Sequence, residues 1–330
     1  MKTVVSGGAG FIGSHLVDAL LELGHDVTVL DNFSTGRLEN LPSACGQVRI
    51  VECDLGSFGE WTEEFAGVDW VFHLAALADI VPSIQNPRAY FQSNVDGTFN
   101  VLQAALQSGV ERLIYVASSS CYGLPDIFPT PESAPIRPQY PYALTKYLGE
   151  ELVLHWAQVY DLAALSLRFF NVYGPRSRTS GTYGAVFGVF LAQKLAGKPY
   201  TIVGDGEQTR DFTYVSDIVS ALITAAQSNR SGKVYNVGSG ATVAINRLVE
   251  LLRGEKVYIP KRPGEPDCTF ADISRIQTEF DWQPQVTIEE GVAKLLEHID
   301  YWKEAPVWTP ETIADATRDW FRYLGGSNTK

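Results

Sequence analysis

Positive charge is scarce in this sequence. Its 330 residues include 26 lysines and arginines but 38 aspartates and glutamates, which gives a formal net charge of −12 at pH 7. No basic stripe with interleaved aromatic residues is present, so the sequence argues against a general nucleic-acid-binding protein. An anionic small molecule is still compatible with this composition, because a few local arginines decide such binding whatever the overall sign.

Cysteine and histidine are scarce as well. The four cysteines contain no C-x-x-C pair, which favours reduced thiols in a cytoplasmic protein over a disulfide framework. They are Cys45, Cys53, Cys121 and Cys268. The five histidines show no H-x-x-x-H pair or other spacing typical of metal ligands. We therefore expect no metal site.

Long hydrophobic runs are absent. No uninterrupted apolar stretch approaches the roughly 20 residues of a membrane-spanning helix, so we expect no membrane partner. The first ten residues, MKTVVSGGAG, reach glycine after two valines. They leave no room for the apolar region of a signal peptide, which again favours a cytoplasmic location.

What the sequence does contain is an alternation of short β-rich segments and longer helical patterns. The expected strands are Lys2–Ser6, Asp26–Asp31, Val48–Glu52, Asp69–Leu74, Glu111–Ser118 and Ala163–Arg168. The expected helices are Phe11–Leu23, Asn86–Ser108 and Tyr140–Tyr160. This repetition predicts an α/β fold with a doubly wound parallel sheet covered on both faces. The rhythm loosens near residue 170, so we expect a sheet domain at 1–170 and a smaller lobe at 171–330, with some segments returning to the first.

A glycine-rich turn follows the first expected strand. In VVSGGAGFIGSHL, Gly7, Gly10 and Gly13 permit a tight turn, and the helix that follows offers free N–H groups to a pyrophosphate. The second expected strand ends in Asp31, 18 residues after Gly13. A carboxylate there accepts hydrogen bonds from a ribose diol and repels a 2′-phosphate. The pattern predicts a dinucleotide site that favours NAD over NADP.

Hydroxyl groups mark the end of the fifth expected strand. Three serines end it, the first being Ser118, and Tyr142 follows about two dozen residues later in a helix with Lys146 one turn beyond. Tyrosine and lysine four residues apart share a helix face, where the ammonium favours the phenolate and makes the tyrosine a usable base. Strand ends at the carboxyl edge of an α/β sheet are where ligands bind.

These stretches resemble the extended short-chain dehydrogenase/reductases, specifically the nucleotide-sugar epimerase/dehydratase group. The matches run in family order over roughly residues 1 to 300, and include SGGAGFIGSHL, LDNFSTG, ASSSCYG, YALTK, RFFNVYGPR, GDGEQTRDFTYVSD, YNVGSG and RPGEP. The resemblance implies a Rossmann-like NAD-binding domain and a smaller lobe that binds a nucleotide sugar. It also implies a homodimer formed through a four-helix bundle of Asn86–Ser108 and Tyr140–Tyr160.

The resemblance assigns roles to individual residues. Ser118, Tyr142 and Lys146 fall at the catalytic positions, with the tyrosine as the base and the lysine on the nicotinamide ribose. The implied cofactor contacts are Gly7, Gly10, Phe11, Ile12, Gly13, Asp31, Asn32, Ser34, Thr35, Gly36, Asp54, Leu55, Leu74, Ala75, Ala76, Ser93, Tyr142, Lys146 and Phe170. The implied substrate contacts are Ser118, Ser119, Asn171, Val186, Phe187, Thr201, Val203, Arg210, Arg262, Glu265 and Thr269.

Two positions after Ser118 bear on the chemistry. Dehydratases of the group carry Asp-Glu there, and related decarboxylases usually keep the glutamate, whereas this chain has Ser119 and Ser120. A hydroxyl is a poor acid or base at neutral pH, so we expect a 4-epimerase that oxidises C4 of a UDP-hexose, UDP-N-acetylhexosamine or UDP-hexuronate transiently. A dehydratase, a decarboxylase, a 4-keto reductase or a non-catalytic sensor of the same fold is the alternative, and the nucleotide base stays open.

Two features lie outside the common motifs. By the resemblance, Thr269 occupies a gate position, where a small residue leaves room for a C2-acetamido group and its hydroxyl could bond the amide. Phe270 or the loop ALADIVPS could fill that space instead.

The tail from about Pro306 extends past the usual family end. Thr309 and Pro310 predict a helix start, and one face of that helix carries Ile313, Ala316, Trp320 and Leu324.

Overall fold

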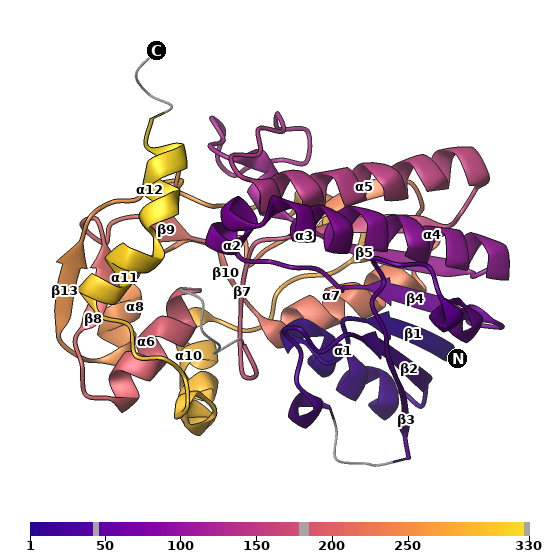
Figure 1. Cartoon of the computed structure of the whole chain (residues 1–330), viewed down its shortest axis with the longest axis horizontal. Helices are drawn as coiled ribbons and strands as arrows, with labels where there is room; N and C mark the ends of the chain where they lie inside the picture. The colour runs from indigo at the N-terminus through magenta and orange to yellow at the C-terminus, as the bar shows by residue number, and fades with distance from the viewer. Residues whose placement is uncertain (42–45, 178–184, 327–330) are drawn as a thin grey trace.

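A seven-stranded parallel sheet organises most of the chain (Figure 1). In this computed structural model, which describes residues 1–41, 46–177 and 185–326, the strand order is β11-β6-β5-β4-β1-β2-β3. Its strands are β1 Lys2–Ser6, β2 Asp26–Asp31, β3 Val48–Glu52, β4 Trp70–His73, β5 Arg112–Ser118, β6 Ala164–Phe169 and β11 Lys233–Val237. The six strands predicted for the first half are confirmed, and none of their ends differs from the prediction by more than one residue.

Helices cover both faces of this sheet. Figure 1 shows α1 (Phe11–Glu22) and α7 (Val215–Gln227) on one side, and α4 (Gly97–Ser108) and α5 (Pro141–Tyr160) on the other. Successive strand residues point to opposite faces, so Val5 packs into the core under α1 while its neighbour Val4 packs into the core under α4. This alternation explains why the strands are apolar throughout.

The helix expected over Asn86–Ser108 is interrupted. It consists of α3 Pro87–Phe91, one π-helical turn at Gln92–Asp96, and α4. Asn94 in the π turn holds the loop after β4, because its side chain accepts from Leu77 N at 2.8 Å and donates to Thr145 Oγ1 on α5 at 3.0 Å. Such π turns occur often at functional sites.

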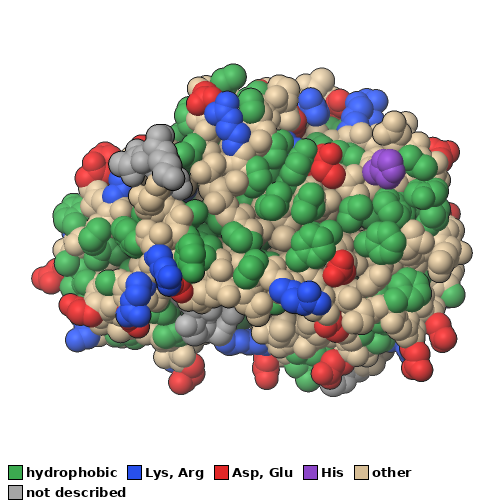
Figure 2. Space-filling model, turned by 45° about the horizontal axis from the view of Figure 1, so that its top comes forward, with side chains coloured by type: hydrophobic (Ala, Val, Ile, Leu, Met, Phe, Trp, Pro, Cys, Tyr) green, Lys and Arg blue, Asp and Glu red, His purple; other side chains and the backbone are tan. Residues whose placement is uncertain are grey.

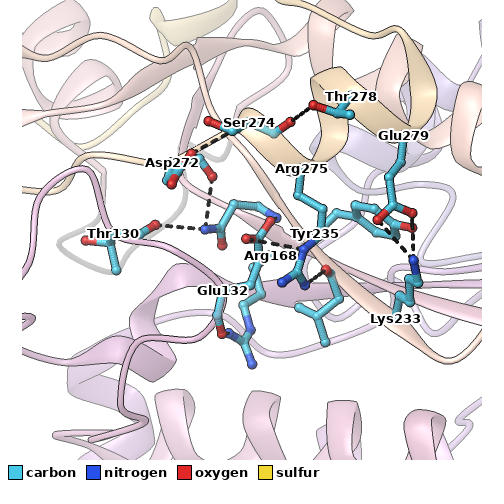
Figure 3. A network of polar contacts seen from close by, with 12 residues as sticks. Thr130, Glu132, Arg168, Lys233, Tyr235, Asp272, Ser274, Arg275, Thr278 and Glu279 are labelled. Atoms are coloured by element: carbon cyan, nitrogen blue, oxygen red, sulfur yellow. Dashed lines mark hydrogen bonds and ion pairs between the residues drawn. The ribbon is translucent and has the colours of Figure 1, made fainter.

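The edge strand β11 is tied down by a later segment of the chain. Figure 3 shows this network, in which Lys233 and Tyr235 contact Glu279 of α9 (Ser274–Phe280) at 2.8 and 2.9 Å. Arg275 of the same helix donates to Val234 O at 2.9 Å. Residues 215–237 and 271–282 thus pack on the sheet or belong to it, although they follow residue 170 in the chain.

The remaining residues form a smaller unit beside the carboxyl edge of the sheet. Its strands pair two by two as β7 Asn171–Tyr173 with β10 Phe212–Tyr214, β9 Thr209–Arg210 with β12 Val243–Ala244, and β8 Tyr200–Val203 with β13 Lys256–Ile259. Its main helices are α6 Val186–Leu195, α8 Ile245–Leu252 and α10 Ile288–Glu297. They share a core of their own, in which Trp302 is fully buried.

The tail forms two short helices, α11 Pro310–Ala316 and α12 Arg318–Leu324, rather than one. The predicted start is confirmed, because Thr309 Oγ1 accepts from Thr312 N at 3.3 Å in a capping box. The break lies at Thr317, whose hydroxyl donates to Ile313 O at 2.8 Å. Ile313 and Trp320 are nevertheless both buried, as the sequence pattern predicts.

Three negative observations concern the described residues alone. They contain no helix long and apolar enough to cross a membrane. They contain no group of three or more histidine, cysteine, aspartate or glutamate side chains that could hold a metal ion. Cys53, Cys121 and Cys268 are free thiols, while Cys45 lies outside the described residues.

Candidate active site

A cavity of about 560 Å³ lies between the carboxyl edge of the sheet and the smaller unit. This volume is in the range of small-molecule sites, roughly 300–1,000 Å³. The cavity brings together all the substrate contacts that the sequence predicted, namely Ser118, Ser119, Asn171, Val186, Phe187, Thr201, Val203, Arg210, Arg262, Glu265 and Thr269. From the predicted cofactor set it adds Phe11, Ile12, Leu74, Ala76, Tyr142, Lys146 and Phe170.

The glycine turn packs directly against the loop after β4. Gly7 has a φ of +72°, and a Cβ there would lie 2.7 Å from Ala75 N, so only glycine fits without strain. A Cβ on Gly13 would collide with the carbonyl of Gly7. Helix α1 begins at Phe11 after the N-cap residue Gly10, which has no side chain to cap it, and this leaves the first amide groups of the helix for an anion.

Asp31 lies beneath this turn at the end of β2 and is 7% exposed. Its carboxylate accepts from Ala9 N and from Phe33 N, both at 2.9 Å. Burial raises the pKa of Asp31, and these backbone hydrogen bonds counteract the rise. The carboxylate therefore holds the glycine turn in place. It also lies at the strand end where a ribose diol is expected to bind.

The other predicted cofactor contacts follow the same edge of the sheet. Loops after β2, β3 and β4 and the π turn carry Asn32, Ser34, Thr35, Gly36, Asp54, Leu55, Ala75 and Ser93. Within the described residues, these positions are not part of the cavity lining. An uncapped helix start, a cradle that a Cβ would fill and a carboxylate at the next strand end together fit a dinucleotide such as NAD.

Lys146 of α5 is 4% exposed and stands 4.3 Å from the ring centroid of Tyr115. Burial lowers its pKa to about 7, and the carboxylate of Glu150, one turn further along, opposes this effect. Tyr142 is half-buried, and burial raises its pKa, while its interaction with Ser118 lowers it. That the Lys146 ammonium favours the Tyr142 phenolate stays a prediction.

Hydroxyl groups gather around Ser118 in the cavity. Ser120 Oγ donates to Ser118 Oγ at 2.9 Å. Tyr142 lies near enough to Ser118, and Tyr140 near enough to Ser120, for each serine to lower the pKa of its tyrosine. The rings of Tyr140 and Tyr142 stack with centroids 6.3 Å apart. The sequence analysis did not include Tyr140 in the site and used Ser120 only as evidence that a carboxylate is absent. The run Tyr140-Pro141-Tyr142 could have indicated that a second tyrosine lies close to Tyr142.

The substrate side is strongly charged. Glu265 lies between two arginines, with its Oε1 2.9 Å from Arg210 Nη2 and its Oε2 2.9 Å from Arg262 Nε. Arg210 is only 7% exposed, and the side chain of Arg262 is 15% exposed. These are therefore not ordinary surface arginines, and their fixed guanidinium groups suit a diphosphate.

Thr269 is small, as a roomy gate requires, but its hydroxyl is already engaged. It donates to Asn171 Oδ1 at 2.8 Å and accepts from Asp211 N at 3.2 Å. One acceptor lone pair of the Thr269 hydroxyl is left, which can accept from the N–H of an acetamido group, so the bond to such a group stays a prediction. Phe270 is not among the described lining residues, whereas Ile80 and Val81 of the ALADIVPS segment are.

A second cavity of about 370 Å³ adjoins the first. The two share Val203, Gln208, Arg210, Glu265 and Pro266. The lining of the smaller cavity alone includes Gly204 and the charged residues Asp205 and Lys261. Arg210 and Glu265 therefore lie where the two cavities adjoin.

Comparison with known proteins decides the family. Residues 3–238 match the model of the NAD dependent epimerase/dehydratase family. This chain belongs to that family. It is 38% identical over 312 residues to a UDP-glucose 4-epimerase of Mycolicibacterium smegmatis, covering 90% of this chain and 98% of the relative.

Two further relatives show how the chemistry varies within the family. The solved UDP-N-acetylglucosamine 4-epimerase from Methanobrevibacter ruminantium M1, in complex with UDP-N-acetylmuramic acid, has a TM-score of 0.86 and 35% identity, covering 91% of this chain and 98% of its own. A UDP-N-acetyl-alpha-D-glucosaminuronate decarboxylase of Bacillus cytotoxicus is 32% identical, covering 90% of this chain and 97% of its own. Family membership thus leaves several nucleotide-sugar reactions to be distinguished by the site.

Proposed function

We propose that the protein is an NAD-dependent 4-epimerase of a UDP-sugar. The observation that carries this proposal is the set of groups around Ser118, where Tyr142 and Ser120 supply hydroxyls and the two positions after Ser118 carry no carboxylate. A hydroxyl pair can move one proton on and off the sugar C4 oxygen, but elimination of water across C5 and C6 needs an additional acid and base. Similarity to UDP-sugar 4-epimerases supports the same reaction.

In the proposed reaction Tyr142 takes the proton of the C4 hydroxyl, with Ser118 holding the same oxygen. Bound NAD would accept the C4 hydride reversibly, and its positively charged nicotinamide would favour the Tyr142 phenolate over the phenol. Lys146 would bind the nicotinamide ribose. The 4-keto sugar then turns over inside the cavity, and Tyr142 returns the proton when the opposite face of C4 is presented.

Turning the sugar requires that the rest of the substrate stays bound. Glu265 holds both arginines, of which Arg210 lines both cavities and Arg262 lines the larger one, and both arginines would bind the diphosphate. The nucleoside would then occupy the smaller cavity and the sugar the larger one. This arrangement anchors the nucleotide while the hexose rotates about its bonds to the diphosphate.

One observation favours a rival reaction. Asp79 lines the larger cavity and lies close enough to Tyr142 for its charge to raise the pKa of the tyrosine. A carboxylate in that place could act as a relocated acid or base of a dehydratase or decarboxylase. Product analysis separates these reactions, because they yield a 4-keto-6-deoxy sugar or a pentose instead of a C4 epimer.

We also propose a homodimer through α4 and α5. Figure 2 shows hydrophobic side chains gathered over this face, and five large ones on α3, α4 and α5 are exposed, namely Phe91, Phe99, Leu144, Val159 and Tyr160. Exposed apolar patches of this kind mark interfaces. Light scattering at micromolar concentration is expected to give twice the chain mass of 36.3 kDa.

The test of the proposed function is an incubation without added cofactor. Purified protein is mixed with UDP-, GDP-, CDP- and dTDP-sugars, and the products are identified by NMR. We expect a UDP-sugar to equilibrate with its C4 epimer, since the hydride taken from C4 is returned in the same turnover. A requirement for stoichiometric reduced cofactor, or a 4-keto-6-deoxy product, would contradict the proposal.

A further inference from the structure

The C-terminal helices α11 and α12 pack along the substrate side of the cavity. Figure 1 shows them running up the smaller unit, with the start of α12 beside α2 (Ile80–Gln85). Their start is fixed where Gln193 Nε2 donates to Trp308 O at 2.8 Å. Ile313 of α11 is buried against Val203 and Ile259. About a tenth of the chain lies outside the alignments with the two relatives and the solved structure described above.

Trp320 of α12 reaches the cavity itself. It is 4% exposed and forms part of the cavity lining. Its Nε1 donates to Pro263 O at 2.7 Å, which fixes the indole against the RPG segment. In that position the guanidinium carbon of Arg262 lies 5.1 Å from the ring centroid, and the ring of Tyr140 lies 6.3 Å away.

Helix α12 also contacts the sheet unit. Asp319 Oδ2, next to Trp320, accepts from Gln85 Nε2 of α2 at 2.8 Å. The same short helix supplies Ile80 and Val81 to the cavity lining. Thus α12 bridges the two sides of the cavity at its edge, with Trp320 directed inward.

We propose that α12 is a wall of the substrate site and that Trp320 positions Arg262 for the diphosphate of the nucleotide sugar. This inference rests on the proposed function for the identity of the ligand. An aromatic ring packs against the flat face of a guanidinium. The N–H groups at the edge of the guanidinium then stay available for hydrogen bonds to phosphate oxygens. Glu265 Oε2 lies 2.9 Å from Nε of the same group in an ion pair, so carboxylate and indole together restrain the guanidinium. Trp320 therefore acts through Arg262 and touches no reacting atom.

The decisive variants are Trp320→Phe and Trp320→Leu. Both fill the space with apolar atoms and both lose the hydrogen bond to Pro263, but only phenylalanine keeps an aromatic face over Arg262. Isothermal titration of UDP, GDP, CDP and dTDP measures binding without turnover. We expect Trp320→Leu to bind the preferred diphosphate roughly tenfold more weakly than wild type, and Trp320→Phe to stay within about threefold. Phe321→Ala, an exposed neighbour on α12, is the matched control and should leave binding unchanged.

A double-mutant cycle shows whether the effect passes through Arg262. In an Arg262→Ala background, Trp320→Leu should cost little further affinity, because the group that Trp320 orients is gone. The KM of the sugar nucleotide should rise in Trp320→Leu by about the same factor as the dissociation constant, with kcat much less affected.

The outcomes separate this inference from the proposed function. Equal affinities of Trp320→Leu, Trp320→Phe and wild type, or an unchanged effect in the Arg262→Ala background, would overturn the inference. Wild-type protein that binds a diphosphate but epimerises no sugar would overturn the proposed function alone. Failure of wild type to bind any of the four diphosphates would overturn both.

Discussion

The two ends of the candidate active site differ in which part of the protein forms them, the backbone or the side chains. At the cofactor end the backbone forms the site, through a glycine turn closed against the next strand loop and a carboxylate held by two amide groups. At the substrate end long side chains form it, with Glu265 between two arginines and Trp320 over one of them. A site formed by the backbone tolerates few substitutions, whereas the side chains that form the other end can be replaced without changing the fold. The cofactor end should therefore govern whether the reaction occurs, and the substrate end which sugar nucleotide enters.

The largest effect is expected where the two ends meet, at Tyr142. Tyr142→Phe removes the hydroxyl that moves the C4 proton and should lower kcat by roughly 10²–10⁴-fold, the usual range for a general acid or base. NAD released on denaturation should stay at the wild-type amount. Tyr147→Phe, half-buried one turn further along α5, should retain wild-type turnover. Wild-type turnover in Tyr142→Phe would remove the tyrosine from the mechanism.

A change at Asp31 should alter the choice of cofactor. Asp31→Asn loses the charge that would repel a 2′-phosphate, and its single oxygen can accept from only one of the two backbone amides that Asp31 binds. We expect NAD binding to weaken by roughly tenfold to a hundredfold, the usual worth of a hydrogen bond to a charged group, and the preference for NAD over NADP to shrink. Equilibrium binding of both cofactors measures this.

The control for Asp31 is Asp69→Asn. Asp69 accepts a backbone hydrogen bond from Lys2 N at the opposite edge of the sheet. Its change should leave the ratio of NAD to NADP affinity alone. If wild type prefers NADP, or if both variants behave alike, the role given to Asp31 is wrong.

The smallest effect is expected at the gate. Thr269→Tyr places a large ring beside Asn171 and should lower kcat/KM for UDP-GlcNAc about tenfold more than for UDP-glucose, as steric discrimination in a pocket allows. Thr269→Ser keeps a hydroxyl for Asn171 and should preserve the wild-type ratio. Equal losses on both sugars, or no wild-type activity on any 2-acetamido sugar, would mean that Ile80 or Val81 closes the space instead.

The contrast between the two ends also explains what the sequence could predict. Gly7, Gly10, Gly13 and Asp31 lie within one strand–helix–strand unit, where spacing follows directly from local geometry. Family resemblance placed Arg210, Arg262 and Glu265 in the site, but only the fold shows that the glutamate joins the two arginines.

Other features depended on contacts between distant segments. Trp320 contacts Arg262, which lies 58 residues earlier in the chain. The periodicity of apolar residues shows that a helix has an apolar face, but it does not show which part of the protein that face covers. The acidity of Tyr142 depends on burial, which the spacing of Tyr142 and Lys146 does not reveal. The π turn that breaks the helix after Phe91 follows from no recognisable residue pattern.

The most direct test of the account uses a UDP-sugar deuterated at C4, incubated with the purified protein in ordinary water without added cofactor. Transient oxidation at C4 with return of the same hydride predicts an epimerised sugar that keeps its deuterium at C4. Loss of the label to solvent or to added cofactor, or a product whose C4 is left as a ketone, would contradict the proposed epimerase.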